Sequence, residues 1–155
     1  MTQDKASLRL WLRLLTCSTM IEREVRTRLR CEFAVTLPRF DMMAALDRAP
    51  EAEGLSMGEL SRYLMVSNGN VTGVAERLVQ EGLARRWSPE TDKRSSRLAL
   101  TDQGRQEFAA MASQHKSWID DMLGDLTAAE REALMMLLAK VKQSIGSDGE
   151  GRDAA

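Results

Sequence analysis

The sequence predicts a mainly α-helical fold with one small β-hairpin, and three observations support this. Aromatic residues make up 5% of the 155 residues while methionine occurs ten times, so the core depends on aliphatic side chains and methionine. Apolar residues recur every three or four positions over most of the chain, which is the spacing of amphipathic helices. Only the segment from Leu83 to Leu100 lacks this period. The length fits a single domain of ordinary size.

Two helices are expected in the first third of the chain. The first runs from Ser7 to about Phe33, where apolar residues at helical spacing alternate with Glu and Arg. The second begins near Pro38, because proline suits the first turn of a helix, and ends before Pro50. The polar residues 51–54, which include a glycine, then predict a loop.

Two further helices follow with a short turn between them. Ser56 and Glu59 have the S-x-x-E spacing of a capping box, and the third helix that they open runs to about Met65. Ser67 is a candidate N-cap for the fourth helix, which ends near Gly82 because glycine favours a helix C-terminus.

A hairpin and two long helices complete the expected fold. Leu83–Leu100 has short apolar stretches on either side of a polar, proline-containing centre, which predicts two strands with a charged tip. Thr101 caps a fifth helix that extends to Gly124, and Thr127 with Glu130 forms a second capping box that opens the sixth. The sequence therefore predicts six helices and a two-stranded β-wing.

The order helix, turn, helix and hairpin from Ser56 to Leu100 is that of a winged helix-turn-helix. The fourth helix carries short polar side chains, and asparagine can bond adenine bidentately while serine and threonine can bond bases or phosphates. A solvated helix start rich in capping residues would explain the same side chains. The candidate DNA contacts on this helix are Ser67, Asn68, Asn70, Thr72 and Arg77.

Positive charge is concentrated at the hairpin. The chain as a whole has a net charge of −1, but Ala84 to Arg105 contains six basic and three acidic residues. A tip carrying Lys93 and Arg94 suits a narrow minor groove, and basic residues at the hairpin base suit phosphates. The alternative is an ordinary solvated hairpin. The candidate DNA contacts here are Arg85, Arg86, Lys93, Arg94 and Arg97, with Asp92 placed to orient Arg94 or Arg97.

The sequence resembles the MarR family of bacterial transcriptional regulators. The residues that carry the resemblance are Leu37–Phe40, the Gly-Glu-Leu-Ser run at 58–61, the fourth helix from Val71 to Leu83, and the wing Asp92–Leu98 followed by Leu100, Thr101 and Gly104. In this family the fourth helix enters the major groove of double-stranded operator DNA and a wing arginine, here Arg94, enters the minor groove. Many members have an arginine where Gly73 stands.

The resemblance also implies a homodimer built by the first, fifth and sixth helices. The expected parts are a dimerisation helix (1–35), a DNA-binding domain (36–100), C-terminal dimerisation helices (101–146) and a disordered tail (147–155). Apolar stripes on these helices support the dimer, because they expose more apolar surface than the small wing domain could cover. These stripes include Leu8, Trp11, Leu15, Met122, Leu134, Leu138 and Val141. The two-fold dimer should bind half-sites on the order of 10 base pairs apart.

A small-molecule effector is expected at the junction between the dimer helices and the DNA-binding part. Residues 68–73 resemble a branch of the family found beside genes for aromatic-acid breakdown, which implies an aromatic carboxylate or its coenzyme A thioester. The expected pocket supplies one cation and an apolar wall. Plain core packing is the alternative. The pocket candidates are Arg39, Phe40, Met43, Trp118 and Met122.

Other functions have weaker support in the sequence. No catalytic set, phosphate loop or metal-ligand cluster is evident, so we expect no enzyme activity, metal or cofactor. Cys17 raises the alternative of a redox-responsive regulator, but Cys17 and Cys31 are expected to be inert, partly buried thiols, and His115 a packed core histidine. A small-molecule carrier of the same fold is a further alternative. No targeting or membrane-spanning segment is visible, which predicts a cytoplasmic protein.

Overall fold

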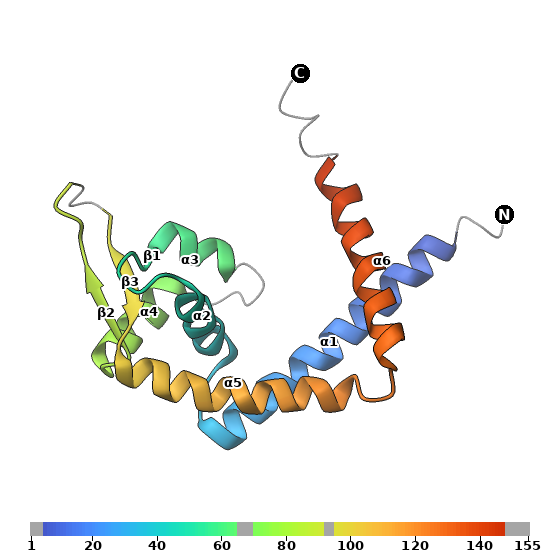
Figure 1. Cartoon of the computed structure of the whole chain (residues 1–155), viewed down its shortest axis with the longest axis horizontal. Helices are drawn as coiled ribbons and strands as arrows, with labels where there is room; N and C mark the ends of the chain where they lie inside the picture. Colours follow the sequence, from blue (N-terminus) through green and yellow to red (C-terminus); the bar gives the residue numbers. More distant parts are fainter. Residues whose placement is uncertain (1–4, 65–69, 92–94, 148–155) are drawn as a thin grey trace. The chain divides into compact units, whose positions relative to one another are not determined.

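The computed structural model describes residues 5–64, 70–91 and 95–147. It contains the six predicted helices and a small antiparallel sheet (Figure 1). The elements in chain order are α1 (Ala6–Phe33), α2 (Leu37–Arg48), β1 (Leu55–Ser56), α3 (Met57–Tyr63), α4 (Val71–Gln80), β2 (Ala84–Trp87), β3 (Arg97–Leu100), α5 (Asp102–Met122) and α6 (Ala128–Ser147). The chain divides between Trp118 and Ile119 into two compact units.

The sheet has three strands in the order β1-β3-β2, whereas the sequence analysis predicted only the β2–β3 hairpin. Leu55 pairs with Leu98 and Arg86 also pairs with Leu98, so β3 lies between its two neighbours. The predicted hairpin is confirmed as β2 and β3, and β1 is a third strand that was not predicted. A strand of two residues is too short to show the alternation by which strands are detected in a sequence.

The predicted capping boxes are confirmed. The backbone N–H of Glu59 donates to Ser56 Oγ at 3.2 Å, and the Glu59 carboxylate accepts from the backbone N–H of Ser56 at 2.8 Å. This second bond holds the pKa of Glu59 below its usual value. Thr127 and Glu130 make the same reciprocal pair at the start of α6, with distances of 2.8 and 3.2 Å.

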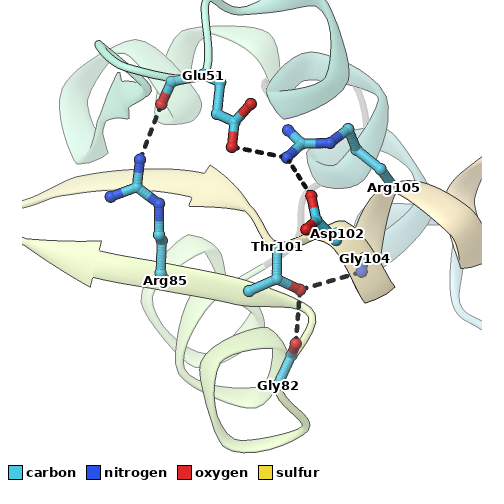
Figure 2. Close-up of polar contacts among 7 residues, drawn as sticks. All are labelled: Glu51, Gly82, Arg85, Thr101, Asp102, Gly104 and Arg105. Carbon is cyan, nitrogen blue, oxygen red and sulfur yellow. Dashed lines mark hydrogen bonds and ion pairs between the residues drawn. The ribbon is translucent and has the colours of Figure 1, made fainter.

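Thr101 joins the end of the wing to α5 (Figure 2). Its hydroxyl accepts from the backbone N–H of Gly104 at 3.1 Å, which caps α5 as predicted. The same hydroxyl donates to the carbonyl of Gly82 at 2.6 Å, just after α4. One side chain therefore links the end of α4 to the start of α5.

The core of the first unit forms around α2. Met42 and Met43 on α2, Leu60 on α3, Leu78 on α4 and Leu98 on β3 are completely buried. Helix α2 contacts α1, α3, α4 and β3. These contacts hold the helix-turn-helix and the base of the wing together as one body, which burial of apolar area stabilises.

The loop between α2 and β1 requires glycine at one position. Gly54 has φ +58° and donates its N–H to the Pro50 carbonyl at 2.8 Å. A Cβ at this position would lie 2.2 Å from the Leu98 carbonyl oxygen, which belongs to the central strand. Position 54 therefore excludes a side chain on two grounds, the backbone conformation and the close approach to β3.

A comparison of Gly54→Ala with Gly82→Ala should separate these two grounds. Gly82 also has a positive φ, of +75°, but a Cβ there would come no closer than 3.8 Å to a neighbour. Gly82→Ala should lower the free energy of unfolding by about 1 kcal/mol, the cost of the left-handed conformation. Gly54→Ala should lower it by roughly 2–4 kcal/mol, because the clash with β3 is added. Urea unfolding measures both; equal losses would contradict the packing described for Gly54.

Candidate nucleic-acid interface

The described part of α4 begins with Asn70 as its N-cap. Asn70 Oδ1 accepts a hydrogen bond from the backbone N–H of Gly73 at 3.1 Å. The predicted cap, Ser67, and the neighbouring candidate Asn68 lie outside the described residues. Asn70 thus has a structural role that the sequence analysis did not assign, and its side-chain amide N–H groups remain able to donate elsewhere.

Helix α4 has one buried and one exposed side. Ala75 and Leu78 are completely buried, whereas Asn70, Thr72 and Arg77 are exposed. Burial of the first pair fixes the helix against its neighbours, so the polar side is held toward solvent. The structure therefore places these three candidate DNA contacts where a groove of DNA could reach them.

Two arginines at the wing base contact the chain itself. Arg85 Nη2 donates to the carbonyl oxygen of Glu51 at 3.0 Å (Figure 2), and its guanidinium lies 4.2 Å from the centre of the Trp87 ring. Arg97 Nε donates to the carbonyl oxygen of Glu53 at 2.6 Å. Both side chains therefore anchor the 51–54 loop to the wing, a role that the count of charges in the sequence did not predict.

Of the three remaining wing candidates, the structure describes only Arg86. Arg86 is exposed on β2 and has no hydrogen-bond or ion-pair partner among the described residues. Its guanidinium is therefore the cation at the wing base most accessible to a phosphate. Lys93 and Arg94, with Asp92, lie outside the described residues.

The residues predicted to form one effector pocket contact different helices. Phe40 is buried against Phe108 and His115 of α5, with ring centroids 5.5 and 4.9 Å apart. Arg39, the next residue along, instead pairs through both terminal nitrogens with the carboxylate of Glu81, at the end of α4. Adjacent residues of a helix point about 100° apart, which accounts for this divergence.

Three of the four apolar members of the predicted pocket, Phe40, Met43 and Trp118, are core residues. Met43 is completely buried, and Trp118 is 3% exposed with its ring 6.3 Å from that of Phe33. Met122 belongs to the second compact unit. His115 is half-buried and packs against Phe40, as expected for a packed histidine. Burial lowers its pKa.

A cavity lies between the start of α2 and the exposed side of α4. Its volume is about 240 Å³. Arg39 and Thr36 border it from the α2 side, and Asn70 and Arg77 border it from α4. The structure therefore brings Arg39, predicted to bind an effector, together with two residues predicted to bind DNA.

Both cysteines are exposed, so the prediction of partly buried thiols was wrong. On α1 the only buried residues are Val25 and Leu29, which leaves Cys17 and Cys31 outside the core of the described chain. Within residues 5–64, 70–91 and 95–147, no group of histidine, cysteine, aspartate and glutamate side chains is arranged to hold a metal ion. None of the helices in this part of the chain is long and apolar enough to cross a membrane.

Comparison with known proteins identifies the family. A model of the MarR family matches residues 35–95. The transcriptional activatory protein BadR of Rhodopseudomonas palustris is 30% identical over 134 residues, which cover 86% of this chain and 76% of BadR. The chain belongs to the MarR family. It is a transcriptional regulator rather than an enzyme, and the predicted winged-helix fold is confirmed.

Solved structures of MarR regulators have the same fold. The crystal structure of a MarR family regulator from Silicibacter pomeroyi has a TM-score of 0.77 at 30% identity, covering 94% of this chain and 99% of that chain. The structure of Sco3205 from Streptomyces coelicolor in complex with DNA has a TM-score of 0.75 at 21% identity, covering 88% and 86%. At 21% identity the similarity concerns the fold alone.

The capping role of Asn70 gives a prediction about stability. Asn70→Ala should lower the free energy of unfolding by about 1 kcal/mol, because the Gly73 N–H loses its acceptor. Asn70→Ser should retain most of the stability, since serine is also a good N-cap. Urea unfolding of the three proteins is the measurement. If alanine and serine were equally destabilising, the cap described for Asn70 would be incorrect.

Proposed function

We propose that this MarR regulator binds a pseudo-palindromic operator as a homodimer, with α4 in the major groove, and releases the operator when a small acid binds. The observation that carries the proposal is the exposed polar side of α4, formed by Asn70, Thr72 and Arg77. Asparagine and arginine are residues that bond base edges and phosphates in this setting. Sco3205, which has the same fold, was solved in complex with DNA, and this supports DNA binding by a protein of this fold.

Exposed apolar surface supports the homodimer. On α1, Leu8 and Trp11 are 56% and 55% exposed. On α6, Leu134, Leu138 and Val141 are each 41% exposed and fall on one side of the helix. Apolar stripes of this kind are usually covered by a partner, and a second copy of the chain covers them with two-fold symmetry.

The direction of regulation has two candidates. A dimer bound over a promoter excludes RNA polymerase and would act as a repressor. The name of BadR, a transcriptional activatory protein, favours activation as the second candidate. A reporter gene under the promoter that the protein binds distinguishes them: expression should rise on deletion of a repressor and fall on deletion of an activator.

The effector class follows from the resemblance of residues 68–73 to regulators of aromatic-acid breakdown. We expect an aromatic carboxylate or its coenzyme A thioester. An effector of DNA binding has to bind one conformation more tightly than the other, and a 99:1 reversal needs a preference of ~10⁴-fold. The contact between α2 and α5 at Phe40 and His115 is a place where a ligand could alter the position of the DNA-binding part.

DNA binding is tested by band-shift assays on DNA upstream of the protein's own gene, with the salt concentration varied. Arg94→Ala should weaken binding to every sequence and reduce the slope of log affinity against log salt by about one. Asn70→Ser should cost about 1–3 kcal/mol, mainly at one base position, because serine keeps the cap but lacks the amide N–H groups that can donate to a base edge. Unchanged affinity in both variants would contradict the proposed interface, and failure of the wild type to bind any DNA would favour the carrier alternative.

Analytical ultracentrifugation at micromolar concentration tests the dimer. The wild type should sediment as a dimer and Leu138→Glu as a monomer, because a charge would be buried in the interface. Ala139→Glu is the matched control, since position 139 is also exposed but points about 100° away. A monomeric wild type would contradict the proposal.

Calorimetric titration of the dimer with aromatic acids and their coenzyme A thioesters tests the effector class. At least one compound should release heat and, in a parallel band-shift assay, release the operator. No heat and no release with any member of the panel would exclude this ligand class.

A further inference from the structure

We infer that the cavity between α2 and α4 is a binding site for one backbone phosphate of the operator, with Arg39 and Arg77 as its cations. The inference rests on the proposed DNA-binding function and assigns to that function a residue, Arg39, that lies outside the recognition helix. The cavity shares Asn70 and Arg77 with the exposed side of α4. A duplex seated on this side of α4 therefore brings its phosphates to the mouth of the cavity.

The size of the cavity suits a small charged group and excludes a coenzyme A thioester. At about 240 Å³, it is smaller than the roughly 300–1,000 Å³ of pockets that enclose drug-sized ligands. A phosphate group that remains attached to a strand of DNA needs only part of such a volume. A coenzyme A thioester is far larger.

Arg39 has one N–H group without an acceptor among the described residues. Its two terminal nitrogens pair with Glu81, which fixes the plane of the guanidinium across the end of α4. Its Nε is buried and has no hydrogen-bond partner among the described residues. A buried N–H group without an acceptor is unfavourable, and a planar guanidinium can bind a second oxyanion along its other edge.

Two further polar side chains at the cavity, those of Thr36 and Arg77, have no hydrogen-bond partner among the described residues. Thr36 is the N-cap residue of α2, but its hydroxyl makes no capping hydrogen bond. Arg77 has no side-chain hydrogen bond or ion pair with any described residue. Because Glu81 offsets only one of the two arginines, the cavity keeps a net positive charge. A charge-assisted bond from each arginine is the way proteins hold a phosphate.

The test is the salt dependence of operator binding for Arg39→Gln, Arg77→Gln and the matched control Arg48→Gln. Arg48 lies on the same helix as Arg39 and is exposed outside this cavity. Each cavity variant should reduce the salt slope by about one and weaken operator and non-specific DNA by the same factor. Arg48→Gln should leave the slope unchanged. If the wild type binds DNA and the cavity variants have the same salt slope as Arg48→Gln, the phosphate site is wrong. The proposed function would remain intact.

A second measurement covers the case in which loss of the Glu81 pair unfolds Arg39→Gln. A set of operator duplexes, each with one phosphate replaced by an uncharged methylphosphonate, is bound to the wild type and to Arg77→Gln. At one position in each half-site, methylphosphonate replacement should weaken binding by the wild type but not by Arg77→Gln. If the effects of Arg77→Gln and of the phosphate replacement on affinity were additive at every position, the proposal would be wrong.

The cavity could instead bind the carboxylate of a free acid, and calorimetry with benzoate distinguishes this from a DNA phosphate. The proposal expects equal benzoate binding by the wild type and Arg77→Gln. If Arg77→Gln abolished benzoate binding and kept the wild-type salt slope, the cavity would be an effector site and the phosphate assignment would be wrong.

Discussion

Burial of α2 on almost every side is the constraint on which the DNA-binding part depends. Phe40, Met42, Met43, Ala45 and Leu46 are all buried, and their positions lie all round the helix rather than along one stripe. Five elements, α1, α3, α4, β3 and α5, pack against this one helix. Asp41 is the polar exception: burial and then the nearby Glu22 raise its pKa, while Arg26 and Arg48 oppose that shift. Neighbouring arginines thus reduce the cost of placing a carboxyl group beside the core.

The loop that leaves α2 extends this body to the wing and to α5. Carbonyl groups of Glu51 and Glu53 accept from Arg85 and Arg97 of the wing strands, and the Glu51 carboxylate pairs with Arg105 of α5 at 2.8 Å (Figure 2). These exposed pairs contribute little stability one by one. Their effect is geometric, because they hold the base of the wing and the start of α5 to the loop that leaves α2. Fixed spacing between a recognition helix and a wing is what simultaneous contact with two grooves requires.

Local features could be predicted from the sequence, and long-range ones could not. The capping boxes at Ser56 and Thr127 were predictable because both partners lie within three residues. Strand β1 was missed because its partner, β3, lies some forty residues away and two residues carry no periodic signal. A count of basic residues predicted a positive wing, but it could not show that Arg85 and Arg97 would bond carbonyl groups of the 51–54 loop. The adjacent residues Arg39 and Phe40 were assigned to one pocket, although helix geometry sends them to different neighbours.

The proposed function requires that α4, held against α2, recognises a two-fold symmetric DNA sequence. Selection of bound duplexes from a random pool by the purified wild-type protein, followed by sequencing, tests this most directly because the protein itself chooses among all possible half-sites. The expected result is enrichment of an inverted repeat whose half-sites are centred on the order of 10 base pairs apart. A pool that binds without enrichment of any sequence, or enrichment of a single unrepeated half-site, would contradict it.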